Sequence, residues 1–444
     1  MIDYAKYVYP EDPLIRERLE VFRDWKLALM LHWGPYSQLG IVESWALSDE
    51  DAEWSRRQVD WRVDGETFKE QYRGLAGTFN PVRFLPEQWA DLASENCFKY
   101  MIFTAKHHDG FCMWDTKLTD YKITSDACPY HASRNADVCA GLFEAFRKKG
   151  MGVVAYFSKA DWNVPSYWAP GMLKGNFMNR GPSYEPSSYP ELWDEFVRFT
   201  HRQVLELLQN YGRIDGLWFD AGWVCKENGQ DIRIEELVHN ARKIQPWVLS
   251  VNRANGGICE NYLTPEQTVP AEASDIPWES CVTMGTSFSF AYEDSYKTVR
   301  ELVHLLIDIV AKGGNLALNV GPQPDGRLPR TAIERMRGMG EWLRVYGEAI
   351  FETRICAPYR VAEFAFTRKA KSAYAFRLYS KSEPPASGMT LIPFYEKISS
   401  LTDLSTGEEL SFAQDMRGVH VSMPERRSIM IADVWKMEFD LIKS

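Results

Sequence analysis

Short apolar runs recur along most of the chain, and stretches with helical periodicity often lie between them. Buried strands that alternate with helices indicate parallel βαβ units. The predicted strands are Lys26–His32, Lys99–Ala105, Gly152–Ser158, Asp215–Phe219, Val248–Val251 and Asn315–Val320. The predicted helices are Pro86–Glu95, Val138–Lys149, Ser188–Tyr211, Ile234–Lys243 and Ser295–Ala311. This many strands over about 330 residues favours an α/β fold with a TIM-like (β/α) barrel, which closes at about eight strands.

The pattern changes after about residue 355, where short apolar runs such as Ala373–Tyr379 and Val419–Ser422 are separated by turn signals. Ser405-Thr406-Gly407 is one such turn. This pattern is typical of an antiparallel β-sandwich. The sequence therefore predicts a catalytic barrel over residues 1–354 and a C-terminal β-sandwich over residues 355–444.

The chain has 444 residues, a formal net charge of −10 and 45% hydrophobic residues. This length suits a barrel with a second unit, and it can bury a large core. No basic stripe occurs, which argues against nucleic acid as a partner. No apolar run approaches the roughly 18 residues of a membrane helix, so no membrane partner is expected.

Aromatic residues make up 14% of the chain, and 16 of them are tryptophan. Such side chains stack on the C–H faces of sugars, but they also fill cores, and composition alone leaves both interpretations open. The eight cysteines show no CxxC spacing, which argues against a zinc site and indicates buried free thiols.

The first residues, Met1 to Tyr4, do not begin a basic region followed by an apolar one, so they do not form a signal peptide. The expected location is therefore the cytoplasm, or the exterior after removal of a signal.

Polar residues at strand ends are candidates for catalysis, because the carboxyl ends of barrel strands carry the active site. Asp220 follows the apolar run Leu217–Phe219, where a carboxylate would be rigid and partly desolvated, as a nucleophile requires. Alternatively, Asp220 caps the next helix. His32 and the pair His107-His108 end neighbouring predicted strands, and they favour the nucleophile.

The histidine pair suits sugar hydroxyl groups, because imidazole nitrogens both donate and accept hydrogen bonds. Two other interpretations stay open. His32, one of the pair and Asp220 could converge on a metal ion, or the pair could bind backbone carbonyls in a structural role.

Glycoside hydrolysis needs a second carboxylate, which in a retaining enzyme lies about 5–5.5 Å from the first. Three glutamates in or just beyond the long loop Asn255–Pro277 are candidates: Glu266, Glu272 and Glu279. Glu279 is slightly preferred, because the adjacent Trp278 would raise its pKa as a general acid requires.

The glycines of Lys312-Gly313-Gly314-Asn315 and Asn319-Val320-Gly321-Pro322 match no phosphate-binding fingerprint. They are interpreted as turn residues, and no cofactor is expected.

Several motifs, in order between about residues 20 and 350, resemble those of glycoside hydrolase family 29, the α-L-fucosidases. They are His32-Trp33-Gly34-Pro35-Tyr36-Ser37, Thr104-Ala105-Lys106-His107-His108-Asp109-Gly110-Phe111, Leu217-Trp218-Phe219-Asp220, Trp278-Glu279-Ser280-Cys281 and the two glycine motifs above. The tail fits the family's C-terminal β-sandwich only loosely.

The resemblance implies that Asp220 is the nucleophile and that Glu279 or Glu266 is the acid/base. It implies fucose contacts from His32, His107, His108, Trp218 and Arg253, and by looser matches from Trp45, Tyr156 and Phe290. Ser44 precedes Trp45 where relatives often have Glu, which leaves open whether Glu43 supplies that carboxylate.

The expected function is an exo-acting, retaining α-L-fucosidase that removes terminal fucose from glycans, glycoconjugates or simple fucosides. The alternatives are an α-L-galactosidase on the same scaffold, a carbohydrate-binding protein without catalysis and a metal-dependent hydrolase. Linkage preference and oligomeric state stay open.

Overall fold

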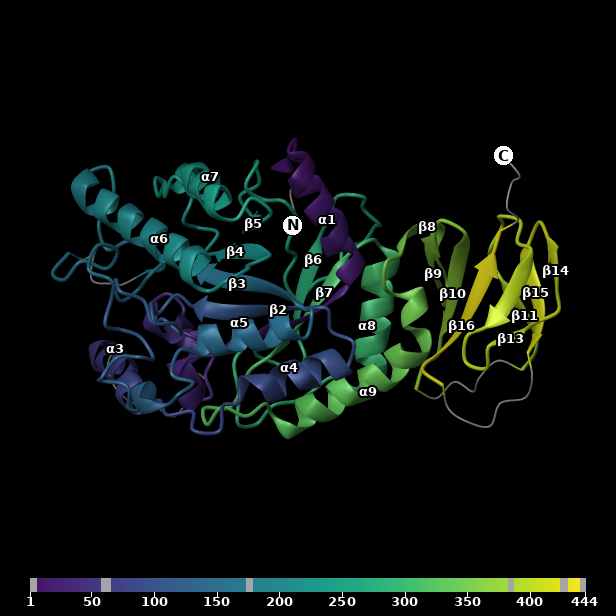
Figure 1. The fold of residues 1–444 in the computed structure, drawn as a ribbon, viewed down its shortest axis with the longest axis horizontal. Coiled ribbons are helices and arrows are strands. Elements are labelled where there is room, and N and C mark those ends of the chain that lie inside the picture. The colour runs from purple at the N-terminus through teal and green to yellow at the C-terminus, as the bar shows by residue number, and fades with distance from the viewer. Residues whose placement is uncertain (1–5, 57–64, 173–178, 382–386, 424–429, 440–444) are drawn as a thin grey trace.

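The computed structural model describes residues 6–56, 65–172, 179–381, 387–423 and 430–439, so the segment Met1 to Tyr4 lies outside the described residues. A parallel sheet with helices around it forms the larger part of the molecule, and antiparallel sheets follow it (Figure 1). The predicted fold class, a TIM-like barrel followed by antiparallel β-structure, is confirmed.

Seven parallel strands form the barrel sheet, in the order β5-β4-β3-β2-β1-β7-β6. They are β1 (Leu27–Leu31), β2 (Tyr100–Lys106), β3 (Gly152–Ser158), β4 (Gly216–Asp220), β5 (Leu249–Asn252), β6 (Glu279–Thr283) and β7 (Asn315–Val320). The sequence pattern predicts all of them except β6. That strand begins with a glutamate and contains serine and threonine, so its hydrophobic signal is weak.

Helices surround the parallel sheet (Figure 1). They are α1 (Pro13–Trp25), α2 (Ala52–Ser55), α3 (Gly65–Gly74), α4 (Pro86–Glu95), α5 (Val138–Lys148), α6 (Pro190–Asn210), α7 (Ile234–Ile244), α8 (Val299–Ala311) and α9 (Arg330–Tyr346). The five predicted helices are present. Helix α8 begins at Val299 rather than Ser295, because Thr298 and Glu301 form a capping box at its start.

An extended segment at residues 261–267 lies between the edge strands β5 and β6. The amide of Asn261 donates to the Ser250 carbonyl of β5 at 2.8 Å. On the other side, the amide of Cys281 in β6 donates to the Pro265 carbonyl at 3.1 Å. The segment thereby closes the barrel and carries Glu266 level with Cys281.

The barrel interior is filled by side chains rather than open. Alternate residues of the strands point inward and are buried: Ala28, Met30, Tyr100, Ile102, Val154, Tyr156, Trp218, Val251, Cys281 and Ala317. Helix α1 covers the end where the strands begin, with Ile15, Leu19 and Phe22 packed against this core. Polar groups at the other end therefore stand on a close-packed base.

The antiparallel part consists of a six-stranded sheet, β13-β12-β16-β10-β9-β8, and a three-stranded sheet, β11-β15-β14. The strands are β8 (Arg354–Val361), β9 (Phe364–Lys369), β10 (Ser372–Leu378), β11 (Gly388–Ile392), β12 (Ser400–Asp403), β13 (Glu408–Glu409), β14 (Phe412–Asp415), β15 (Gly418–Met423) and β16 (Ala432–Glu438). Phe366 and Trp435 of the larger sheet share an apolar core with Ile392 and Val421 of the smaller one.

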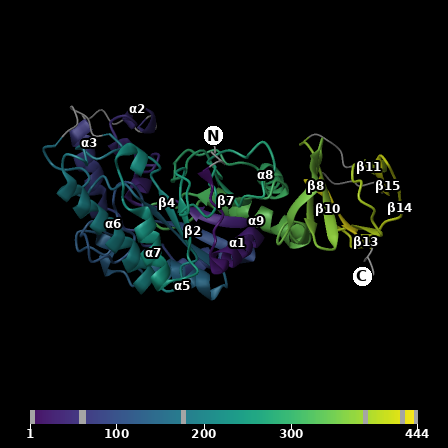
Figure 2. The ribbon, with the colours of Figure 1, turned by 90° about the horizontal axis from the view of Figure 1, so that it is seen from above.

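The antiparallel sheets sit beside α8 and α9, at one end of the molecule (Figures 1 and 2). Arg300 of α8 donates to the carbonyls of Tyr379 and Met430 at 2.7 and 2.8 Å. Arg354 pairs with Asp24, which precedes β1, at 2.6 Å. The first contact joins the sheets to the start of α8, and the second joins β8 to the end of α1, beside the start of β1. Within the described ranges, no helix combines the length and apolarity needed to cross a bilayer.

Lys26, between α1 and β1, tests the packing at the end of the barrel that α1 covers, which we call the closed end. Its side chain is fully buried, and its Nζ atom has no hydrogen-bond partner among the described residues. Burial, together with Arg354 and Arg23, lowers the pKa of Lys26 to about 7. An unfolded lysine titrates near 10.4, so between these values the unfolded chain binds the extra proton and folding becomes more favourable as pH rises.

We expect Lys26→Met to increase the free energy of unfolding by about 1–3 kcal/mol below pH 7, because it removes an unsatisfied buried group. The gain should shrink as pH rises from 7 towards 10. Urea unfolding of both proteins at pH 6 and pH 9 measures this. An equal difference at the two pH values would contradict the burial of a titrating amine.

Candidate active site

The predicted strand-end residues meet at one end of the barrel. Asp220 is the last residue of β4, and His32 directly follows β1. His107 and His108 follow β2, and Arg253 follows β5. All five belong to the carboxyl ends of parallel strands, which converge in this fold.

Both carboxylate oxygens of Asp220 have partners. The Tyr156 hydroxyl donates to Oδ2 at 2.5 Å, and Arg253 Nη1 donates to Oδ1 at 2.9 Å. Burial alone would raise the pKa of Asp220, but the Arg253 guanidinium and the Tyr156 hydroxyl outweigh it and hold that pKa well below its usual range. Asp220 is therefore an ionised carboxylate in a nearly dry environment.

The hydrogen bonds of His108 and His32 fix which ring nitrogen carries the proton. Ser158 donates its hydroxyl to the Ala160 carbonyl at 2.7 Å, so it must accept from Nδ1 of His108, at 2.7 Å. In the same way, Asn319 Oδ1 accepts from Nδ1 of His32 at 2.7 Å. The Nε2 atom of each ring therefore bears a lone pair and can accept a hydrogen bond.

All three histidines are held neutral. Burial lowers the pKa of His32 and of His108 to about 4, and that of His107 well below its usual value. Nδ1 of His107 lies 2.6 Å from the Ser44 hydroxyl, and its ring is parallel to that of Tyr156 at 5.7 Å. These rings can bind hydroxyl groups without adding charge.

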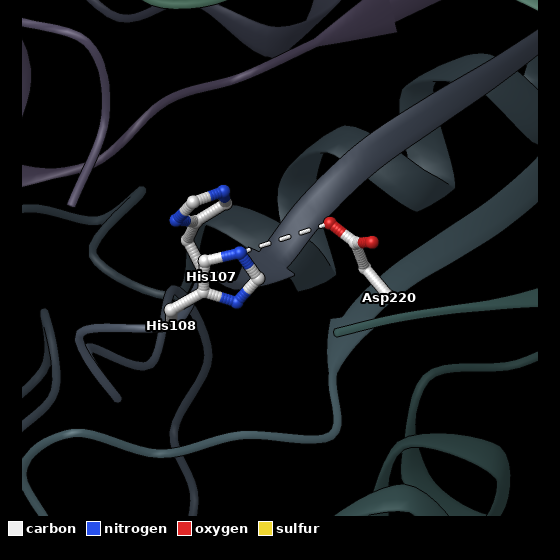
Figure 3. Close-up of side chains that lie close together, drawn as sticks. All are labelled: His107, His108 and Asp220. Atoms are coloured by element: carbon white, nitrogen blue, oxygen red, sulfur yellow. Dashed lines mark ion pairs between the residues drawn. The ribbon is translucent and has the colours of Figure 1, made fainter. Parts of the chain in front are cut away.

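His107, His108 and Asp220 lie close enough to share a metal ion (Figure 3). One ligand atom from each lies within 4.8 Å of the other two, and Nε2 of His108 is 3.8 Å from Oδ2 of Asp220. The Arg253 guanidinium already neutralises Asp220, however, and its positive charge opposes a cation at this position. The donor set fits hydroxyl recognition better than metal binding.

A cavity of about 530 Å³ opens above Asp220. Its lining includes Glu43, Trp45, Trp54, Arg180, Asp220, Trp223, Arg253, Glu266 and Phe288. His108 and His32 are packed against two of these residues, Trp45 at 4.9 Å and Phe288 at 5.0 Å between ring centroids. This volume is in the range of small-molecule sites, about 300–1,000 Å³.

Two aromatic positions differ from the sequence-based expectation. Phe290 is not among the residues that line the cavity, and its ring packs against Tyr292 at 5.0 Å. Phe288, two residues earlier, borders the cavity and contacts His32 instead. The two side chains belong to the repetitive stretch Ser287-Phe288-Ser289-Phe290, in which sequence alone gives no reason to prefer either phenylalanine.

Glu43 borders the cavity, whereas Ser44 turns towards His107. The Glu43 carboxylate accepts from the Ser289 amide at 2.7 Å. Burial raises the pKa of Glu43 to about 8, so it is largely protonated at pH 7. A carboxyl group is thus present beside Trp45 in the cavity, and Glu43 supplies it.

Glu266 is the candidate second carboxylate that shares the cavity with Asp220. One guanidinium joins them, because Nη1 of Arg253 binds Asp220 and Nη2 binds Glu266. Within that span the two carboxylates can adopt the separation of about 5–5.5 Å that retaining glycosidases use. The Glu266 side chain is 42% exposed, so it has room to turn.

Glu279, the preferred candidate from the sequence, lies elsewhere. It begins β6 and pairs in register with Asn315, the first residue of β7, whereas Asp220 ends β4. Its carboxylate is fully buried and accepts from the Tyr100 hydroxyl and, at 3.2 Å, from Nε1 of Trp218. Burial raises the pKa of Glu279 to about 7, but Glu279 is not among the residues that line the cavity with Asp220.

Glu272 is also remote from the cavity. Its carboxylate accepts a hydrogen bond from the hydroxyl of Tyr359 in β8, in the antiparallel part of the chain. It is not among the residues that line the cavity.

Trp218 forms the base of the site. Its ring stacks on Tyr156 at 5.3 Å, and the Arg253 guanidinium lies over it at 5.0 Å. Trp218 thus supports both residues that bind Asp220, while Glu279 holds its indole N–H from below.

Comparison with known proteins agrees with this geometry. The Alpha-L-fucosidase family model matches residues 3–348. The tissue alpha-L-fucosidase of Rattus norvegicus is 26% identical over 423 residues, which cover 91% of this chain and 85% of that protein. The plasma alpha-L-fucosidase of Homo sapiens is 26% identical over 418 residues, covering 90% and 84% respectively.

Solved structures show the same relationship. Alpha-L-fucosidase isoenzyme 1 from Paenibacillus thiaminolyticus superposes with a TM-score of 0.79 at 27% identity, covering 96% of this chain and all of that one. The alpha-fucosidase of Thermotoga maritima, solved in complex with fucose, gives a TM-score of 0.74 at 28% identity, covering 97% of this chain and 100% of that one.

The position of Glu279 leads to a stability prediction. Glu279→Leu should lower the free energy of unfolding by about 2–5 kcal/mol, because the Tyr100 hydroxyl and the Trp218 indole N–H lose their acceptor in a dry interior. Chemical denaturation of the purified variant measures the loss.

Tyr100→Phe, introduced into the Glu279→Leu variant, provides the control. The double variant should recover part of the lost free energy of unfolding, because it removes one of the two donors that Glu279→Leu leaves without an acceptor. Full stability of Glu279→Leu would show that the buried hydrogen bonds do not hold this part of the barrel together.

Proposed function

The chain belongs to the alpha-L-fucosidase family, and as a member of that family it is a glycoside hydrolase; from this premise we propose that it removes terminal α-L-fucose with retention of configuration. The proposal assigns the nucleophile to Asp220 and the acid/base to Glu266. It assigns no catalytic proton transfer to Glu279 or Glu272.

In the first step, an Asp220 oxygen attacks the anomeric carbon of fucose. The bond from that carbon to the leaving-group oxygen breaks, and Glu266 transfers its proton to that oxygen. Because Glu266 pairs with Arg253 as a carboxylate, it must turn away from this guanidinium and take up a proton from solvent before it can donate one. Its partial exposure supports such a movement.

In the second step, a water molecule attacks the anomeric carbon of the fucosyl-enzyme. Glu266 accepts a proton from that water, and the bond to Asp220 breaks. Two inversions at the same carbon give α-fucose again. Arg253 and Tyr156 keep Asp220 ionised and correctly oriented for both steps.

Hydroxyl recognition falls to the neutral histidines. The Nε2 atoms of His32 and His108 accept hydrogen bonds from sugar hydroxyls, and His107 extends this polar surface. Glu43, largely protonated at pH 7, donates a further hydrogen bond within the same cavity. Trp45 and Phe288 provide apolar contacts for the ring and its methyl group.

The observation that carries the proposal is the single Arg253 guanidinium that joins Asp220 to Glu266 in one cavity. Treatment with 2-deoxy-2-fluoro-α-L-fucosyl fluoride should trap the covalent intermediate. The anomeric fluoride leaves readily, and the fluorine that stays at C2 slows hydrolysis of the fucosyl-enzyme. Mass spectrometry of the digested protein should find the label on Asp220. A label on another residue would overturn the assignment.

We expect Asp220→Gly to lower kcat for an aryl fucoside by roughly 10³-fold or more, because the covalent route is lost. Added azide should restore turnover by direct displacement and yield the β-fucosyl azide. Circular dichroism and the Tm of the isosteric Asp220→Asn variant control for folding. Activity near that of the wild type would contradict a nucleophilic role.

Glu266→Ala should lower kcat/KM for a fucosylated disaccharide by roughly 10²–10⁴-fold, because an unactivated leaving group needs a proton. With fucosyl fluoride, whose fluoride ion leaves without a proton, the rate of the first step should fall much less. Azide should here give the α-fucosyl azide, since the covalent intermediate still forms.

Glu279→Gln is the matched control, because it preserves the shape of a carboxyl group that lies outside the cavity. If Glu279→Gln showed the leaving-group dependence and Glu266→Ala did not, the acid/base assignment would be reversed.

A further inference from the structure

The cavity above Asp220 has an exposed tryptophan at its rim. Trp54 of α2 lines the cavity, and 41% of its surface is accessible. We propose that Trp54 is the stacking platform for the sugar ring attached to fucose, the leaving group, and that this subsite takes neutral pyranoses. This inference rests on the proposed fucosidase function.

Trp54 is held in a fixed orientation. Its Nε1 atom donates to Oδ1 of Asp51 at 3.0 Å. Asp51 is in turn fixed by Arg180, whose Nε and Nη2 atoms donate to its two oxygens at 2.8 and 2.6 Å. A large aromatic face that is already ordered binds a sugar ring with little loss of conformational entropy.

The order of the aromatic rings places Trp54 outside the fucose site. The Trp45 ring lies 4.9 Å from His108 on its inner side and 6.0 Å from Trp54 on its outer side. Trp54 is therefore one ring further from the histidines than Trp45. Figure 2 shows α2 in the part of the molecule remote from the antiparallel sheets.

The position of the scissile bond supports the same assignment. Asp220 and Glu266, which act on opposite sides of that bond, line the same cavity as Trp54. A sugar on the far side of the bond must extend outward, because the inner side is occupied by the buried histidines and Tyr156. The outer part of the cavity, with Trp54, is the space that remains for it.

The charges around the cavity favour a neutral ring. Both cations among its described lining residues are already paired: Arg180 with Asp51, and Arg253 with Asp220 and Glu266. Among the lining residues that the structure describes, no cation is therefore left to neutralise a sulfate or a carboxylate on the leaving group. The nearby carboxylates would instead repel such an anion.

The test compares Trp54→Ala with the wild-type enzyme on two substrates. One is α-L-fucosyl fluoride, which has no leaving-group sugar. The other is the best substrate from a panel of neutral disaccharides with α1,2-, α1,3-, α1,4- and α1,6-linked fucose. We expect kcat/KM for the disaccharide to fall about tenfold, mainly through KM, since stacking on an aromatic ring contributes on this order.

The same variant should hydrolyse fucosyl fluoride as the wild type does. Trp54→Phe should keep most of the disaccharide activity, because it preserves an aromatic face. Tyr395→Ala, at a 58% exposed aromatic residue in the antiparallel part, should change neither substrate. The proposal that Trp54 stacks on the leaving-group sugar would be overturned by unchanged hydrolysis of the disaccharide by Trp54→Ala, or by an equal loss of kcat/KM on both substrates.

A second comparison tests the neutral class. A disaccharide whose leaving-group ring carries a sulfate or a carboxylate should show a lower kcat/KM than its neutral counterpart, and a preference for the anionic ring would overturn the inference. Failure of the wild-type enzyme to hydrolyse fucosyl fluoride would instead reject the proposed function itself, so the two failures are distinguishable.

Discussion

The arrangement at the barrel mouth depends on one ionic interaction, the Arg253 guanidinium between the carboxylates of Asp220 and Glu266. Without it, two carboxylates so close together would repel each other, and one would tend to take up a proton. The guanidinium removes that conflict for Asp220, whose pKa it holds well below the usual range. In the proposed mechanism, substrate separates Glu266 from Arg253, so the interaction that orders the site would also decide when the proposed acid becomes available.

This ion pair is supported from below by the barrel core. Arg253 lies over the Trp218 ring, Tyr156 stacks on the same ring, and Glu279 holds its indole N–H. Beneath them the interior is close-packed and covered by α1. The nucleophilic role proposed for Asp220 requires such support, because the mobility of neighbouring side chains would lower the rate.

The inner and outer parts of the site differ in their chemistry. Around Asp220, neutral histidines with fixed tautomers offer acceptors for hydroxyl groups, and burial keeps them uncharged over the physiological pH range. Further out, Trp54 and the paired Arg180 present a broad, apolar and electrically balanced surface. The inner residues follow barrel strands, whereas Trp54 lies on the connection after β1, and such connections vary more freely than the strands they join.

The sequence by itself determined six of the seven parallel strands, five of the nine described α-helices and the meeting of Asp220 with His32, His107 and His108. These features follow from local hydrophobic patterns and from the rule that parallel strands deliver their carboxyl ends to one place. Only the tertiary structure shows that Glu266 and Phe288 line the cavity with Asp220, whereas Glu279 and Phe290 are not among its lining residues. The register of β6 places Glu279 at the closed end of the barrel, while the segment beside β6 lifts Glu266 to the open end. Register depends on hydrogen bonds between segments far apart in the chain, and a local sequence pattern does not contain that information.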